Sequence, residues 1–222
     1  VFFGTPVVIG GDSRESTPAF ITAVSQGLIN GGAEVESLGM VPTPVVAAES
    51  ARRNAVGVVI SASHNPFFDN GIKVFGPGGV KLSTETEAQI EAEWNRQDAP
   101  NEVAKPSGNM TTGEMADVQV RYLERITSAI EQRSLQGIRV VIDAANGAAS
   151  QLAGEVFASV GADVIVIHAD PNGTNINDGC GATHTQTLQA AVLAYGADVG
   201  LALDGDADRL IAVDHLGNVV DG

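Results

Sequence analysis

The sequence predicts an α/β fold made of two consecutive three-layer domains, each with a mostly parallel mixed sheet. Short apolar runs typical of buried strands alternate with segments typical of helices, and this alternation occurs twice along the 222 residues. Between the two series, residues 98–113 are rich in turn formers and weakly periodic, which indicates a linker or an exposed excursion. We therefore expect a first domain over residues 1–107 and a second domain over residues 108–222.

The first series begins with the apolar run 7–9, which predicts a buried strand ended by glycines. The next helix is expected over 16–30, because hydroxyl residues and Pro18 mark its start and a glycine pair marks its end. The other strands expected in this series are 35–38, 56–60 and 72–75, and the other helices are 42–54 and 84–97.

The second series follows a helix expected over 115–132, and it opens with the strand 139–143 and a helix that ends near residue 160. The further strands expected are 163–167, 199–203, 210–213 and 219–220, and the further helix is 185–195. In such sheets, ligands bind beyond the carboxyl ends of the strands. Two polar loops lie in that position, one after the strand 56–60 and one after the strand 199–203.

The composition excludes several classes of partner. The chain has 27 acidic and 12 basic residues, a net charge of −15, so non-specific binding to nucleic acid or to an anionic membrane is not expected. Cys180 is the only cysteine, which rules out a disulfide within the chain and fits a cytoplasmic location. No apolar run approaches membrane-spanning length. Both ends are abrupt, and we expect them to be cut from a longer protein.

The loop after 199–203 carries three alternating carboxylates, Asp204, Asp206 and Asp208. Alternate side chains of an extended segment share one side, and three bunched carboxylates repel one another unless a cation binds. Hard oxygen ligands favour Mg²⁺ or Ca²⁺, and Mg²⁺ suits a site shared with a phosphate. A calcium EF-hand is rejected, because Arg209 and His215 occupy its glycine and glutamate positions. The alternative is an acidic surface turn.

The loop after 56–60 places Ser63 beside His64. A serine acts as a nucleophile only when it is activated, or it arrives phosphorylated and acts as a phosphoryl donor. A phosphate would bring nearly two negative charges, which Lys73, Arg209 and a metal could offset. Arg14 also follows a strand and could meet a phosphate, although a solvated loop arginine fits equally well. For Ser63 itself, an ordinary turn hydroxyl remains open.

Both loops resemble motifs of the α-D-phosphohexomutase superfamily. The run 61–66 (SASHNP), followed by 69–73 (DNGIK), is similar to that family's phosphoserine loop. The run 204–209 (DGDADR) is similar to its metal loop, with an alanine where glycine is common. The segment 171–183, with PNG, NIN and GCGAT, is typical of the family's glucosamine branch rather than its mannose or glucose branches.

This resemblance implies a fold, a reaction and a set of roles. It implies domains I and II of a four-domain enzyme that interconverts glucosamine 6-phosphate and glucosamine 1-phosphate through a bisphosphate, for UDP-N-acetylglucosamine synthesis. The implied partners are a phosphorylated amino sugar and a sugar bisphosphate, with a homodimer left open. Ser63 would carry the phosphoryl group. The implied Mg²⁺ ligands are the Ser63 phosphate oxygen, Asp204, Asp206 and Asp208. The side chains implied to surround the transferred phosphoryl group are those of His64, Lys73 and Arg209.

The chain also departs from the family. The family's N-terminal FGTDGIRG segment is matched only by 3–5, so its arginine is absent here, and domains III and IV have no counterpart. We therefore expect the fragment alone to be inactive. Three alternatives stay open: a mutase of the mannose or glucose branch, a magnesium-binding module without turnover, and a haloacid-dehalogenase-like phosphatase with Asp204 as nucleophile.

Overall fold

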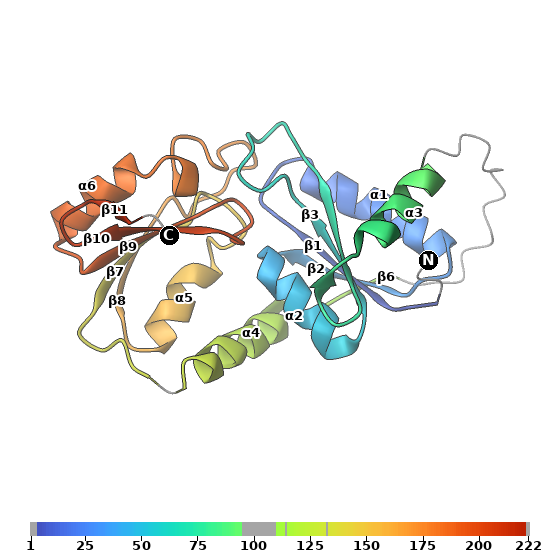
Figure 1. The fold of residues 1–222 in the computed structure, drawn as a ribbon, viewed down its shortest axis with the longest axis horizontal. Helices are drawn as coiled ribbons and strands as arrows, with labels where there is room; N and C mark the ends of the chain where they lie inside the picture. The colour runs from blue at the N-terminus through green and yellow to red at the C-terminus, as the bar shows by residue number, and fades with distance from the viewer. Residues whose placement is uncertain (1–3, 95–109, 114, 132, 221–222) are drawn as a thin grey trace.

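The first half of the molecule is an α/β unit built on one mixed sheet. The computed structural model describes residues 4–94, 110–113, 115–131 and 133–220 (Figure 1). The strand order of the first sheet is β5 (Val80–Lys81), β4 (Ile72–Gly76), β3 (Val56–Ile60), β1 (Val7–Gly11), β2 (Val35–Met40) and β6 (Met110–Thr112). Its helices are α1 (Thr17–Asn30), α2 (Thr43–Arg53) and α3 (Thr84–Trp94). The four neighbouring strands β3, β1, β2 and β6 run parallel to one another. Strand β4 pairs antiparallel with β3, and β5 pairs antiparallel with β4.

The second half repeats this plan with another mixed sheet. Its strand order is β11 (Val219–Val220), β10 (Leu210–Asp214), β9 (Val199–Leu203), β7 (Arg139–Asp143) and β8 (Asp163–Ile167). Its helices are α4 (Met115–Ala129), α5 (Leu152–Ser159), the short 3₁₀ helix η1 (Gly181–Thr183) and α6 (Gln186–Tyr195). The strands β9, β7 and β8 are parallel, and β9–β10–β11 form an antiparallel meander. Helix α4 runs from beside α2 toward α5, between the two sheets (Figure 1).

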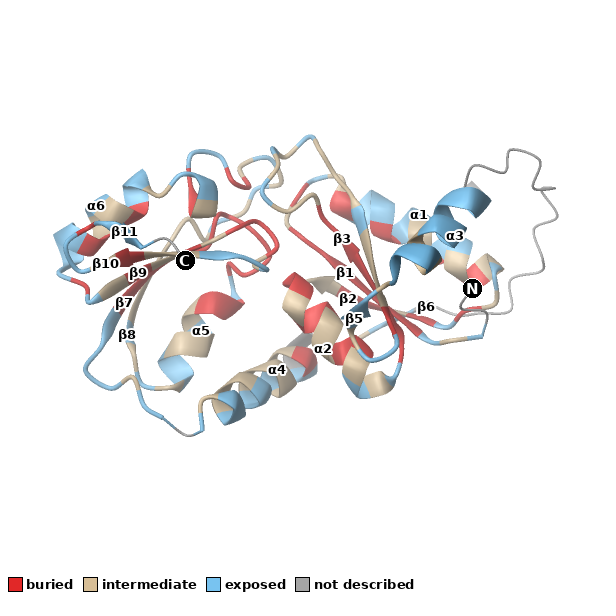
Figure 2. Ribbon diagram, in the orientation of Figure 1, coloured by how far each residue is buried: buried red, intermediate tan, exposed pale blue. Residues whose placement is uncertain are grey.

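The apolar core continues from one half into the other. On one face of the first sheet, Val8, Leu38 and Val59 pack against α2, and the same buried cluster includes Val118 of α4 and Leu152 of α5. Figure 2 shows the buried residues concentrated in the central strands of both sheets. Because this packing spans both halves, it fixes how their loops face each other.

A buried polar network reinforces the same junction. Glu49 of α2 is 4 % exposed and accepts hydrogen bonds from Arg52 and Arg53 of its own helix and from Arg121 of α4. Burial alone would raise the pKa of Glu49, but the hydrogen bonds from Arg52, Arg121 and Arg53 lower it to about 2. The carboxylate therefore stays charged and binds α4 to α2.

The expected fold class is confirmed, with one correction between the halves. Residues 98–113 were expected to form a linker or an exposed excursion, but 110–112 form β6, which pairs in parallel with β2. A three-residue strand in a turn-rich segment leaves no periodic pattern, and the open edge of β2 supplies its hydrogen bonds. The expected domain boundary at 107/108 lies outside the described residues. Among those that are described, no helix is both long and apolar enough to span a membrane.

Candidate active and metal site

The serine loop leaves the carboxyl end of β3 in a strained conformation. Ser63 has a φ of 55°, in the left-handed region that non-glycine residues seldom occupy. Its backbone N–H donates to Ser61 Oγ at 2.9 Å, and the N–H of Ser61 donates to the carbonyl of Gly71 at 2.9 Å. The loop is thus closed on itself, and it holds the Ser63 side chain in one direction. Such strain persists only where the surroundings enforce it.

The acidic loop leaves the carboxyl end of β9, as predicted. A tight turn brings the N–H of Ala207 to the carbonyl of Asp204 at 2.9 Å, and Asp204 Oδ1 accepts the N–H of Arg209 at 3.0 Å. The side chains of Asp204 and Asp206 are each 1 % exposed, whereas that of Asp208 is 34 % exposed. Two of the three carboxylates therefore lie in a desolvated position.

The two loops, 141 residues apart in sequence, meet at the Ser63 hydroxyl. Ser63 Oγ donates to Asp204 Oδ2 at 2.6 Å. Arg209 Nη2 donates to Ser63 Oγ at 2.6 Å and to Asp204 Oδ2 at 2.9 Å, and it lies 2.6 Å from His64 Nδ1. A group attached to Ser63 Oγ would thus lie beside one guanidinium, one imidazole and one carboxylate.

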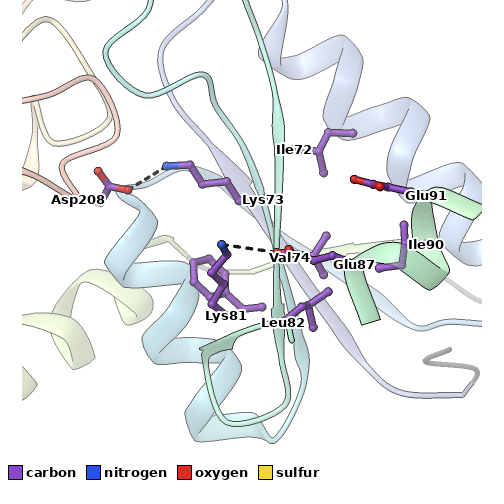
Figure 3. A pocket seen from close by; sticks show the side chains of 10 residues that line it. Ile72, Lys73, Val74, Lys81, Leu82, Glu87, Ile90, Glu91 and Asp208 are labelled. Atoms are coloured by element: carbon purple, nitrogen blue, oxygen red, sulfur yellow. Dashed lines mark hydrogen bonds and ion pairs between the residues drawn. The ribbon is translucent and has the colours of Figure 1, made fainter. Parts of the chain in front are cut away.

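Lys73 closes the site from β4. Its ammonium donates to Asp206 Oδ2 at 2.6 Å and to Asp208 Oδ2 at 2.9 Å, and Figure 3 shows it reaching from the strand toward Asp208. Partial burial would lower the pKa of Lys73, but the hydrogen bonds to the two carboxylates raise it above its usual value. Lys73 therefore provides a fixed positive charge. Beside it opens a cavity of about 670 Å³, bordered by β4 and α3 (Figure 3).

The donor set of this site fits a hard divalent cation. One carboxylate oxygen each from Asp204, Asp206 and Asp208 lies within 4.8 Å of the others. Asp206 Oδ2 accepts from Lys73 and from Thr43 Oγ1 at 2.6 Å, but Asp206 Oδ1 is buried and has no hydrogen-bond partner. A buried carboxylate oxygen without a partner is costly. A cation bound among these oxygens would remove that cost.

Arg14 lies beneath the serine loop. It is 1 % exposed, it forms a buried ion pair with Asp12, and its Nη2 donates to the carbonyls of Ser63 at 3.2 Å and Asn65 at 2.6 Å. Burial raises the pKa of Asp12, although the charge of Arg14 opposes that rise. The sequence left two roles open for Arg14. A solvated loop arginine is wrong, because the side chain is buried, and a direct contact with a phosphate would require the guanidinium to leave these partners. The placement instead favours a role in supporting the loop.

The structure adds two residues to which the sequence analysis assigned no role in the site. Thr43, at the start of α2, donates its hydroxyl to Asp206 Oδ2, and its N–H donates to the Asp206 carbonyl at 2.9 Å. Asn177 Nδ2 donates to the carbonyls of Ser63 at 2.9 Å and Asn65 at 3.1 Å. In the sequence, Thr43 resembles an ordinary helix start, and Asn177 belongs to the NIN run that was noted only as typical of the family branch, so neither indicated a contact with the site.

A second cluster of possible ligand atoms lies inside the second domain. Asp143, His168 and Cys180 each place one such atom within 4.8 Å of the others. Asp143 Oδ1 accepts the N–H of Ala145 at 2.9 Å, and Oδ2 accepts the N–H of Gly181 at 2.9 Å with His168 Nδ1 at 3.1 Å. Burial, and then the neighbouring carboxylates, raise the pKa of the Cys180 thiol to about 12. The carboxylate of this cluster thus has the bonding of a structural turn, whereas His168 Nδ1 is buried without a hydrogen bond.

Two models of one protein family match the chain. The model described as "Phosphoglucomutase/phosphomannomutase, alpha/beta/alpha domain I" matches residues 3–101, and the model for domain II matches residues 120–217. The chain belongs to this family. The expected membership of the phosphohexomutase superfamily is thereby confirmed, and the two matched domains correspond to the two sheets.

Individual members of the family agree with this assignment. The chain is 50 % identical over 216 residues to a phosphoglucosamine mutase of Mycobacterium sp. (strain KMS), an alignment that covers 97 % of this chain and 48 % of the relative. The chain thus spans about half the length of the curated relatives it matches.

Solved structures show the same two-domain arrangement. A phosphoglucomutase/phosphomannomutase family protein from Burkholderia thailandensis superposes with a TM-score of 0.79 at 28 % identity, over 98 % of this chain and 48 % of its own. The Aspergillus fumigatus N-acetylphosphoglucosamine mutase, solved in complex with GlcNAc-6P and magnesium, gives a TM-score of 0.55 at 21 % identity, over 81 % and 49 % of the two chains. At that identity, the second comparison bears on the fold alone.

Proposed function

We propose that this chain supplies the phosphoserine and metal-binding half of a phosphoglucosamine mutase. The observation that carries the proposal is the 2.6 Å contact between Ser63 Oγ and Asp204 Oδ2, which joins the two family loops across the two domains. The proposed substrate class is that of the relatives named phosphoglucosamine mutase, to which the chain is 50 % identical in sequence. The proposed ligands are therefore a phosphorylated amino sugar and a sugar bisphosphate, and the lone cysteine is compatible with a reducing cytoplasm.

In the proposed reaction, phosphorylated Ser63 gives its phosphoryl group to a free hydroxyl of the sugar phosphate, which yields a bisphosphate. The second phosphoryl group of the bisphosphate then returns to Ser63. Arg209 Nη2, which donates to Ser63 Oγ, stabilises the negative charge that this oxygen gains as the phosphoryl group leaves. Lys73 and His64 supply further donors at the edge of the transferred group. Transfer of this kind depends mainly on positioning and on charge neutralisation.

The proposed metal is Mg²⁺, held by Asp204, Asp206 and Asp208 with the phosphate oxygen of Ser63. When bound, Mg²⁺ would supply countercharge and polarise the phosphoryl group. The charge balance supports this proposal. Three carboxylates face the two cations Lys73 and Arg209, and a phosphate on Ser63 would add nearly two more negative charges. A divalent cation offsets that excess.

A phosphatase that uses Asp204 as its nucleophile is less well supported. Asp204 Oδ2 is buried and accepts hydrogen bonds from Ser63 Oγ, from Arg209 Nε at 3.0 Å and from Arg209 Nη2. An oxygen with three donors is a poor nucleophile, because these bonds must break before it attacks. The serine hydroxyl, by contrast, lies where a phosphoryl group could be received.

The test is to locate the phosphoryl group after incubation with ³²P-labelled glucose 1,6-bisphosphate and Mg²⁺. We expect label on Ser63 that resists neutral hydroxylamine, and no label in the Ser63→Ala variant. Label on Asp204 that hydroxylamine removes would contradict the proposal.

A coupled assay with glucosamine 6-phosphate, mannose 6-phosphate and glucose 6-phosphate distinguishes the branches of the family. The full-length gene product and the 222-residue chain are assayed side by side, and we expect turnover to depend on the additional sequence.

A further inference from the structure

Two backbone carbonyls of the serine loop are bound by side chains from both domains. The carbonyls of Ser63 and Asn65 each accept a hydrogen bond from Arg14 Nη2, and each also accepts one from Asn177 Nδ2. Arg14 belongs to the same domain as the loop, whereas Asn177 is 114 residues from Ser63 and belongs to the second domain. Both donors are buried, at 1 % and 7 % exposure. Of these two donors, only Asn177 can therefore fix the loop backbone relative to the second domain.

Asn177 is itself held rigidly. Its φ of 58° is in the left-handed region, which asparagine tolerates better than most residues, and its N–H donates to the carbonyl of Ala145 at 2.9 Å. A Cβ added to Gly205 would lie 2.7 Å from the Ser63 carbonyl oxygen and 2.8 Å from Asn177 Nδ2. The backbone of the acidic loop therefore touches both partners of this hydrogen bond, and the three loops meet at one point.

The bond from Asn177 differs in kind from the other links to Ser63. Among the described residues, the remaining cross-domain hydrogen bonds of Ser63 involve its hydroxyl oxygen, with Asp204 and Arg209 as partners. Once that oxygen is esterified, it has no hydrogen left to donate to Asp204. The bond to the Ser63 carbonyl does not depend on the state of the hydroxyl, so it persists in both forms.

We propose that Asn177 is a positioning residue that holds the serine loop in register with the acidic loop in both the free and the phosphorylated state. The inference depends on the proposed phosphoryl transfer at Ser63. Ser63 has an unfavourable left-handed backbone, and its carbonyl is bonded to the Cα that carries the reacting side chain. Fixing the orientation of that carbonyl fixes the direction of the Ser63 Cα–Cβ bond, from which the reacting hydroxyl extends. Without Asn177, Arg14 still binds the loop, but among the described residues no other hydrogen bond joins the backbone of the loop to the second domain.

The test uses Asn177→Asp in the full-length gene product. Aspartate has the same shape and accepts the left-handed conformation, but it replaces the donor with an oxygen that faces two carbonyls. We expect the rate of phosphoryl transfer between glucose 1,6-bisphosphate and Ser63, and kcat, to fall about 100-fold, the effect of a misplacement near 1 Å. KM and the affinity for Mg²⁺ should stay within about threefold, because no proposed ligand is changed.

The matched control is Asn175→Asp in the same loop. Asn175 Nδ2 donates to the carbonyl of Asp170 at 3.0 Å, so the substitution has the same local chemistry without a contact to the serine loop. We expect kcat within about threefold of the wild type. Equal losses in both variants, or a folded Asn177→Asp variant with unchanged transfer, would overturn the inference. If Asn177→Asp does not fold, Asn177→Ala removes the donor without adding charge and must still lower kcat more than KM. Absence of transfer in the wild type would instead refute the proposed function.

Discussion

The described residues hold two clusters of potential metal ligands, and the two clusters differ in how their carboxylates are satisfied. In the acidic loop, Asp206 Oδ1 is buried without a hydrogen-bond partner. In the cluster of the second domain, both oxygens of Asp143 accept backbone N–H groups, from Ala145 and from Gly181. In each cluster, the potential ligand atoms lie within 4.8 Å of one another. Distance alone therefore does not distinguish them.

The difference lies in how the protein satisfies each carboxylate. An aspartate that accepts two N–H groups in a turn already has its charge stabilised, so a cation gains little there and must displace a hydrogen bond. An aspartate with an unpartnered oxygen, among further carboxylates, leaves a cost that a cation can remove. The comparison implies that substitutions in the first cluster should change metal affinity, and that substitutions in the second should change stability.

The largest expected effect is that of Asp206→Asn on Mg²⁺ binding. Asparagine keeps the oxygen that accepts from Lys73 and Thr43 and places an NH₂ group where the unpartnered oxygen lies. Loss of an outer-sphere partner typically costs 10–100-fold in metal affinity, so loss of a direct ligand should raise the Kd by about 100-fold or more. Isothermal titration of the 222-residue chain with Mg²⁺, or with Mn²⁺ detected by electron paramagnetic resonance, measures this change.

The same variant provides its own control, because its stability without metal should change by less than about 1 kcal/mol. Urea unfolding of the metal-free wild type and of Asp206→Asn gives that value. A variant that loses several kcal/mol without metal would show that Asp206 is a structural carboxylate like Asp143, and the distinction between the clusters would fail.

The next largest effect is expected for Asp143→Asn. An amide has one accepting oxygen, so its NH₂ group must face one of the N–H groups of Ala145 or Gly181. A buried donor without an acceptor costs about 1–3 kcal/mol, and we expect the free energy of unfolding to fall by about 2 kcal/mol. The Kd for Mg²⁺, measured by the same titration, should stay within about twofold of the wild type. A marked loss of Mg²⁺ affinity would connect the two clusters and contradict this account.

The sequence was sufficient to predict the two sheets and the position of a polar loop after one strand of each. The apolar runs 56–60 and 199–203 are continuous, so their assignment as buried strands did not depend on weak propensities. Since ligands bind at the carboxyl ends of parallel strands, each loop was expected to be a ligand-binding loop. That the two loops meet was implied by the family resemblance, and Ser63 Oγ lies 2.6 Å from Asp204 Oδ2. The strand β6 was missed, because it depends on the edge of β2 and not on its own residues.

The supporting residues of the site could not be predicted, because their roles depend on how the domains pack. Asn177 and Thr43 bind partners in the other domain, and that arrangement is set by the shared core of α2, α4 and α5. No periodicity within either segment contains this information. Arg14 has the composition of a solvated loop, and only the burial of its ion pair with Asp12 reveals a supporting role.

The smallest expected effect is that of Cys180→Ala, and it is best detected at alkaline pH. Burial raises the pKa of the Cys180 thiol from 9.0 to about 12, so the folded chain keeps a proton that the unfolded chain releases above pH 9. The contribution of this thiol to stability is therefore complete below pH 9 and is lost as the pH rises toward 12.

At neutral pH, the alanine variant should lose only about 1 kcal/mol, the cost of a small cavity. Between pH 9 and 12, the difference in unfolding free energy between wild type and variant should shrink, because only the wild type loses the contribution of the thiol. Other alkaline titrations occur in both proteins and cancel in this difference. A constant difference would show that the thiol titrates normally, and a thiolate charge-transfer band with Co²⁺ would show that this cluster binds metal after all.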